Sequence, residues 1–295
     1  MIPPSFDYHV AKTLPEAVAL LAKLGQNGDE AKVLSGGQSL LPLLKLRLAR
    51  PAHLVDIGRI PGLDYIKEEG GFLKIGALVR ESQLDASELV RAKYPILVDT
   101  TEVIADPLVR NQATVAGNLA HGDPANDHPA TMLAVGAEVV ITGPKGQRTV
   151  PVKQFFTGIF TTVLEATDVL SEVRVPVPPP GSGGAYEKLE RKVGDFATAG
   201  AAAFLVIGGG KIEHAGIGLT NVGPTPIKAT DAEQFLVGKK PDAATFAEAA
   251  KRAAAAASPS PDRRGKEDYK REMARVLTVR ALTRAAARAT KTGGK

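Results

Sequence analysis

Hydrophobic positions in the first sixty residues recur first at helical spacing and then in short runs. A capping box begun by Thr13 and completed by Glu16 opens a segment with leucine or valine at 18, 20, 21 and 24, and Gly25 follows it. This pattern predicts a helix over residues 14–24. Short apolar runs at 32–34 and 53–58 predict two strands. The opening sixty residues therefore form one compact α/β subdomain.

Leucines crowd the segment that follows the first predicted strand. They occupy positions 40, 41, 43, 44, 46 and 48. At helical spacing they cover most of the circumference, so we predict a buried helix. Ser39 is suited to cap it, and Pro42 is tolerated in its first turn.

A second region runs from about residue 61 to 177. Its apolar runs predict strands at 72–78, 137–142 and 148–152, with helices near 87–91, 95–104 and 129–135. Four prolines and three glycines then fall between Pro176 and Gly184, which indicates a linker. Strand patterns at 201–207 and 212–219 follow, and then an alanine-rich helical end. We predict an α+β protein with domains at 1–177, divided near residue 60, and at 178–295.

The amino-acid composition excludes several kinds of cofactor and metal site. The chain of 295 residues contains no cysteine, so it cannot ligate an iron–sulfur cluster through cysteine or form disulfides. Its five histidines lack metal-ligand spacing, and no Ser–His–Asp arrangement is legible, so we predict neither a metal site nor a catalytic residue on this chain. The first ten residues do not resemble a signal peptide, and the longest uncharged run, 196–210, is shorter than the ~20 residues of a membrane span. We expect a cytoplasmic protein.

Positive charge is concentrated at the C-terminal end. The net charge is +5, yet residues 263–295 contain eleven Lys or Arg against three Asp or Glu. A basic tail can bind nucleic acid, but this one has a single aromatic residue, Tyr269, and no recognition motif. Apolar residues at 273, 276, 277 and 281 alternate with arginines, which favours a helix that packs on its own domain or on a partner.

Two glycine-bearing stretches are candidate ligand sites. The first, Ser35–Ser39, reads SGGQS and lies between a predicted strand and helix. It can be an ordinary tight turn, or its free N–H groups can bind an anion. The second, Ala113–Asn118, reads ATVAGN and can be a glycine-bearing loop or a β-bulge. Because the two lie about eighty residues apart in adjacent subdomains, they suggest one ligand with two phosphates.

Two charged residues have both structural and functional interpretations. Asp127 precedes His128-Pro129 and is placed to cap a helix. Lys188 lies in a predicted strand. The simplest interpretation is an exposed charge, unless its side chain contacts a ligand.

These motifs resemble a known family. The opening MIPPSFDYH, the two glycine stretches, ADPLVR at 105–110, GDPAND at 122–127, AYEKLERK at 185–192 and GLTNV at 218–222 are similar to the FAD-binding medium subunit of molybdenum hydroxylases, most closely the aerobic carbon monoxide dehydrogenase type. The resemblance covers essentially the whole chain. It implies a two-subdomain FAD-binding fold of the vanillyl-alcohol oxidase type and a small α+β C-terminal domain.

The resemblance also implies a set of cofactor-binding residues. Ser35 to Ser39 would cradle the FAD pyrophosphate, residues 114–118 would line the cofactor from the other subdomain, and Asp127 would hydrogen-bond the polar part of the flavin. The complete set is Ser35, Gly36, Gly37, Gln38, Ser39, Ile104, Thr114, Val115, Ala116, Gly117, Asn118, Asp127, Val169, Leu170, Lys188 and Phe196.

Three positions depart from the family pattern. Gln38 stands where relatives often have histidine, and Ala116 stands where a glycine is commoner. Phe196 replaces a tyrosine that covers the isoalloxazine, so the ring can still stack but the hydroxyl is lost.

The implied function is electron transfer. The family's medium subunit takes electrons from iron–sulfur clusters of a small subunit, which receive them from a large molybdopterin subunit, and passes them to an external quinone or cytochrome. A dimer of heterotrimers is expected, with an association through its partners with the inner face of the membrane. The alternative is a self-sufficient flavin oxidoreductase acting on its own organic substrate.

Overall fold

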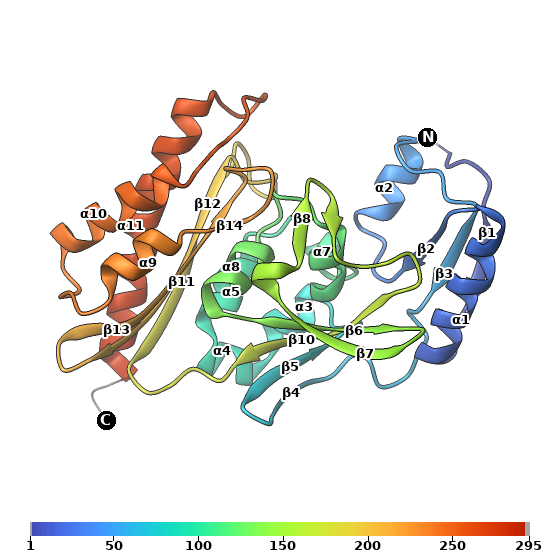
Figure 1. The fold of residues 1–295 in the computed structure, drawn as a ribbon, viewed down its shortest axis with the longest axis horizontal. Coiled ribbons are helices and arrows are strands. Elements are labelled where there is room, and N and C mark those ends of the chain that lie inside the picture. Colours follow the sequence, from blue (N-terminus) through green and yellow to red (C-terminus); the bar gives the residue numbers. More distant parts are fainter. Residues whose placement is uncertain (1, 293–295) are drawn as a thin grey trace.

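The computed structural model describes residues 2–292 and has three adjoining parts (Figure 1). The first, at the right of Figure 1, is a parallel sheet of order β1-β3-β2, made of Asp7–Val10, His53–Asp56 and Ala31–Leu34. Helix α1, Leu14–Leu24, packs on this sheet, with Leu21 buried. The side chain of Thr13 accepts the N–H of Glu16 at 3.2 Å. The predicted helix and its cap are confirmed.

The leucine-rich segment differs from its prediction. Helix α2 spans only Leu40–Lys45, and only Leu44 in it is buried. The chain turns at Arg47, which has a positive φ of 59°. Leu46 and Leu48 are therefore left 53% and 72% exposed. The predicted buried helix was wrong because leucines placed all round a short helix cannot all reach the core. Ser39 also makes no side-chain capping bond.

The second part is a five-stranded sheet with helices beside it. Its order is β4-β5-β10-β6-β7. The strands are Ile66–Glu69, Phe72–Gly76, Val169–Pro176, Glu138–Gly143 and Gly146–Pro151, and a small hairpin pairs β8 (Phe156–Gly158) with β9 (Thr161–Thr162). The helices are α3 Glu81–Ala86, α4 Glu88–Lys93, α5 Pro95–Glu102, α6 Pro107–Arg110, α7 Val115–His121 and α8 His128–Val135. A short 3₁₀ turn at Val152–Gln154 belongs to this part, and another at Gly25–Asn27 follows α1 in the first part.

The third part is an antiparallel sheet, drawn in yellow and orange at the left of Figure 1, with helices on both faces. Its strands, in the order β11-β12-β13-β14, are Ser182–Leu189, Ala199–Gly208, Lys211–Thr220 and Ile227–Lys228. Three helices follow the strands: α9 Thr230–Leu236, α10 Ala243–Ala255 and α11 Glu267–Thr292. Helix α11 packs on β11 and β12, while α5 and α8 pack on β11, β12 and β13. Residues 199–203 are all buried for this reason.

The linker is shorter than predicted. Strand β10 ends at Pro176 and β11 already begins at Ser182, so the connection is residues 177–181. Two of the three glycines that suggested a loop, Gly183 and Gly184, lie inside β11. A Cβ on Gly183 would stand 2.2 Å from the carbonyl oxygen of Ala285, so glycine allows α11 to approach the strand.

The basic helix α11 packs against its own domain. Its buried face consists of small and apolar residues, including Ala274, Leu277 and Ala281. Arg284 Nη2 and Arg288 Nη1 reach Asp99 of α5 at 2.9 and 2.6 Å. Two arginines of this basic helix therefore form ion pairs that join the third part to the second. Among residues 2–292, no helix is long and apolar enough to cross a membrane.

Candidate functional site

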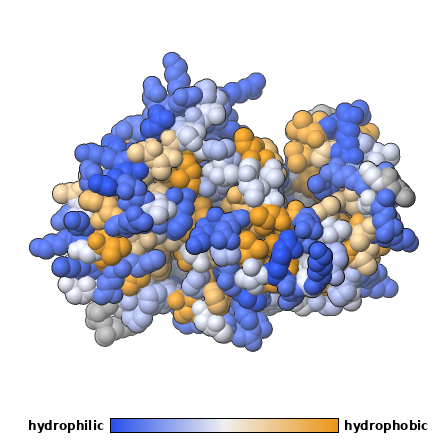
Figure 2. All heavy atoms as spheres, viewed as in Figure 1, coloured by the Kyte–Doolittle hydropathy of each residue, from blue (hydrophilic) through white to orange (hydrophobic). Residues whose placement is uncertain are grey.

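A cavity of about 1310 Å³ lies where the first two parts meet. Its walls come from the two predicted glycine stretches, from α2, from the β8–β9 hairpin and from the segment before β12. Figure 2 shows hydrophobic residues on the surface over α2, beside the hollow between the two lobes. Leu40, Leu43 and Leu48 line the cavity, which accounts for leucines that do not enter the core. Pockets for small molecules usually measure ~300–1,000 Å³, so this one has room for a large, extended ligand.

The first glycine stretch offers unpaired backbone donors. Within residues 2–292, the N–H groups of Gly36, Gly37, Gln38 and Ser39 donate to no protein acceptor. A Cβ on Gly36 would lie 2.1 Å from the carbonyl oxygen of Gln112, and Gly37 has a φ of +73°. Glycine is required at both positions, by close approach at one and by backbone conformation at the other. The stretch is therefore more than a turn, because its donors face a cavity.

The second glycine stretch is the start of helix α7, and not the β-bulge or open loop that we considered. Thr114 is its N-cap and accepts the N–H of Gly117 at 3.1 Å. Thr114 also meets the hydroxyl of Ser35 at 3.2 Å, so the two stretches are hydrogen-bonded to each other. Ala116 lies within the helix, where a Cβ costs nothing. Asn118 lines the cavity, and its Oδ1 atom is buried and has no hydrogen-bond partner among the described residues.

Asp127 belongs to a buried polar cluster. It stands at the N-cap of α8 but makes no side-chain capping bond, so the structural interpretation of this residue was wrong. Its Oδ1 accepts the hydroxyl of Tyr186 at 2.6 Å, and its Oδ2 accepts Lys188 Nζ at 2.9 Å. Burial raises the pKa of Asp127 above its ordinary value, and the ammonium of Lys188 opposes that rise. Burial and the neighbouring carboxylate raise the pKa of Tyr186 well above 10.

Lys188 is not the exposed strand charge that its pattern suggested. Its side chain is 2% exposed. Besides Asp127 it donates to the backbone oxygen of Val103 at 2.8 Å and lies 3.3 Å from Glu190 Oε2. A buried ammonium and carboxylate pair at a cavity wall is a fixed pair of opposite charges, which can orient a polar ligand.

Nearly all of the sequence-predicted residues line this one cavity. Only the side chain of Val115 does not, because it is fully buried in the core. The amide of Gln38 donates to the carbonyl oxygen of Gly36 at 3.3 Å and so supports its own turn. Phe196 also lines the cavity and is 48% exposed.

Sequence reasoning missed several cavity residues. Tyr186 lies within a quoted motif, but nothing in the pattern showed that it holds Asp127. His121 lines the cavity and packs on Phe160, with ring centroids 5.1 Å apart. Burial lowers the pKa of His121, so its imidazole is neutral at pH 7. Ala105 and Phe160 line the cavity with positive φ angles of 46° and 52°, a conformation that is uncommon outside glycine and concentrates at ligand sites.

The donor set fits an anionic dinucleotide. Two helix N-termini meet, one of them with four free N–H groups, which is an arrangement that binds diphosphate. The orphaned oxygen of Asn118 and the cluster at Asp127 provide polar contacts, and leucine and phenylalanine side chains provide apolar walls. Within residues 2–292, no group of three His, Asp or Glu side chains is placed to hold a metal ion.

Comparison with known proteins decides the family. The model described as "FAD binding domain in molybdopterin dehydrogenase" matches residues 4–178, and the "CO dehydrogenase flavoprotein C-terminal domain" matches 184–285. This chain belongs to the FAD-binding medium chains of the molybdenum hydroxylases. It is thus an oxidoreductase subunit, and the cofactor of this family is FAD.

Members of this family resemble the chain along its whole length. The carbon monoxide dehydrogenase medium chain of Hydrogenophaga pseudoflava is 49% identical over 288 residues, covering 98% of this chain and 99% of the relative. A solved carbon monoxide dehydrogenase structure from that organism superposes with a TM-score of 0.94 at 50% identity, covering 97% and 99% of the two chains. The solved structure of quinoline 2-oxidoreductase from Pseudomonas putida 86 superposes with a TM-score of 0.90 at 35% identity, covering 97% of this chain and 99% of that chain. The predicted fold class is confirmed.

Proposed function

We propose that this chain is the FAD-carrying subunit of an aerobic carbon monoxide dehydrogenase and passes electrons from a partner's iron–sulfur cluster to an external acceptor. The observation that carries the proposal is the cavity at which the free N–H groups of Gly36–Ser39 meet the N-terminus of α7. The identity to carbon monoxide dehydrogenase medium chains supports the choice of complex. We further propose a domain division near residue 178.

The residues of this chain would bind and shield the cofactor. The amides of Gly36–Ser39 and the start of α7 would hold the pyrophosphate, and Asn118 would offer its unpaired oxygen. The Asp127–Lys188 pair would orient the polar edge of the flavin, while Phe196 and Ile104 would exclude water. When bound, FAD supplies the electron-accepting ring. No side chain of the chain needs to act as an acid or base.

The partners would be a small iron–sulfur subunit and a large molybdopterin subunit, assembled as a dimer of heterotrimers. A quinone or cytochrome would receive the electrons. We propose that the assembly works in the cytoplasm and associates with the inner face of the membrane through its partners. The lack of cysteine supports the need for a partner that carries the clusters.

The visible spectrum of the protein, purified with the subunits that copurify, tests the proposal. We expect flavin bands with one FAD per chain, and their loss in Gly37→Val. Gly62→Val is the matched control, since Gly62 has nearly the same φ, +75°, but does not line the cavity. Equal flavin content in wild type and both variants would contradict the assignment of the site. Turnover of an organic substrate by the chain without partners would favour a self-sufficient oxidoreductase instead.

A further inference from the structure

The segment Glu190–Phe196, here called the cover segment, closes one side of the cavity and connects β11 to β12. Gly194, Asp195 and Phe196 line the cavity. The segment has little apolar anchoring of its own, because Val193 is 94% exposed and Phe196 is 48% exposed. Polar contacts must therefore decide where the phenyl ring lies.

Asp195 concentrates those polar contacts. Its Oδ1 accepts the N–H of Phe196 at 2.8 Å and Arg264 Nη2 at 2.8 Å, and its Oδ2 accepts Arg191 Nε at 3.1 Å. The side chain of Asp195 is 10% exposed. Its pKa is lowered to about 2, chiefly by Arg264. The carboxylate is therefore fully charged above about pH 4 and loses its charge only as the pH falls towards 2.

Arg264 comes from the C-terminal domain, 69 residues further along the chain. Its guanidinium carbon lies 5.8 Å from the centroid of the Phe196 ring, within the range of a cation–π contact. One arginine thus touches both the carboxylate and the aromatic ring of the cover segment.

The loop that presents Arg264 is itself tied down. Asp262 Oδ1 accepts the N–H of Arg264 at 2.7 Å, and its Oδ2 accepts Lys270 Nζ at 2.8 Å. Lys270 is buried at the start of α11 and donates also to the carbonyl oxygen of Ser260 at 3.1 Å. The guanidinium therefore stands on an ordered support and not on a free loop.

We propose that Arg264 is a positioning residue through which the loop before α11 holds Asp195 and the ring of Phe196 over the cavity and so slows release of the cofactor. That the retained molecule is FAD rests on the proposed function. The ordering of the cover segment by Arg264 does not depend on the proposed function.

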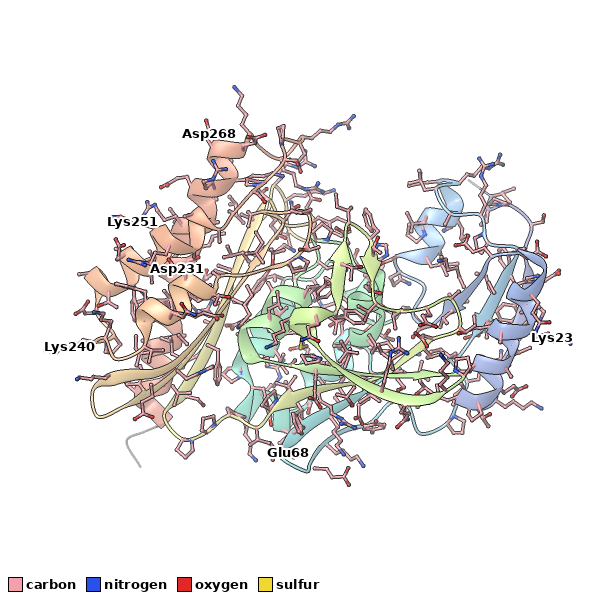
Figure 3. All side chains as sticks on the ribbon, in the orientation of Figure 1. Lys23, Glu68, Asp231, Lys240, Lys251 and Asp268 are labelled. Carbon is pink, nitrogen blue, oxygen red and sulfur yellow. The ribbon has the colours of Figure 1, made fainter. Side chains whose placement is uncertain are left out.

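The test compares Arg264→Gln with a matched variant of the whole protein. Arg252 has the same combination of contacts elsewhere, since its guanidinium carbon lies 4.5 Å from the Phe235 ring and its Nη1 lies 3.2 Å from Asp231 Oδ2. Asp231, labelled in Figure 3, lies on α9 in the left lobe, away from the cavity. Arg252→Gln therefore removes a similar pair without touching the site.

We expect Arg264→Gln to release FAD about tenfold faster than wild type, with Arg264→Lys in between because it keeps the charge but not the planar group. Arg252→Gln should match wild type in release rate. Equal rates in wild type and Arg264→Gln, or equal acceleration in both glutamine variants, would overturn the proposal.

Hydrogen exchange of the apoprotein tests the positioning role of Arg264 independently of FAD binding. Peptides covering 190–197 should exchange faster in Arg264→Gln than in wild type or Arg252→Gln, since the N–H groups of Asp195 and Phe196 are hydrogen-bonded within this segment. If wild type binds no FAD but the exchange difference is found, the function fails and the positioning role stands. Unchanged exchange would refute the role whatever the cofactor.

Discussion

The two glycine stretches that meet at the cavity use glycine for different reasons. At Gly36 the lack of a side chain allows the backbone to contact that of Gln112. At Gly37 the lack of a side chain allows a positive φ. The stretch at 114–118 is an ordinary capped helix start, in which Ala116 has helical geometry. The first stretch depends on glycine for its backbone shape and close approach, while in the second a Cβ on Gly117 would stand 2.7 Å from Thr114 Oγ1, the atom that caps the helix. A similar sequence signature thus rests on two different physical constraints.

The largest effect should follow from Gly36→Ala. The added Cβ would lie 2.1 Å from the oxygen of Gln112, so the two stretches must move apart. We expect the free energy of unfolding to fall by about 1–3 kcal/mol and FAD retention to be lost. Denaturant unfolding of the apoprotein and flavin content after gel filtration measure the two effects. Full retention of FAD would show that the contact between the stretches is not needed.

An intermediate effect should follow from Thr114→Val, which has a similar shape but no hydroxyl. It removes the acceptor for the N–H of Gly117 and the bond to Ser35, so we expect a loss of about 1 kcal/mol in stability and weaker FAD binding. Thr13→Val is the control, because Thr13 caps α1 in the same way but does not line the cavity. The two variants should lose similar stability, and only Thr114→Val should bind FAD more weakly. Equal FAD affinities of the two variants would show that Thr114 only caps its helix and does not contribute to binding.

The smallest effect should follow from Ala116→Gly, which introduces the glycine that the family resemblance leads us to expect at this position. Because Ala116 already has helical geometry, the substitution should only raise the flexibility of the unfolded chain and cost about 0.5–1 kcal/mol. The dissociation constant for FAD, measured by titration of the apoprotein, should change less than twofold. A large gain in affinity would mean that the methyl group obstructs the cofactor.

Local patterns predicted most elements of this fold. The capping box at Thr13 and the apolar runs in β6, β12 and β13 are short-range features, and their helices and strands formed where expected. The leucines of α2 and the glycines of β11 misled the same reasoning. Their environments are a cavity wall and a neighbouring helix, and neither is encoded in the spacing of residues along one segment.

The sequence by itself determined the family, the two glycine stretches and the absence of cysteine ligands, because these depend on residue identity and order. Tertiary structure alone decided that Asp127 bonds Tyr186 and Lys188 and does not cap its helix, and that Arg264 reaches a carboxylate 69 residues before it. The contacts of Asp127 join two domains, and that of Arg264 joins two loops of one domain. Only packing fixes which side chains then lie within hydrogen-bonding distance and out of water.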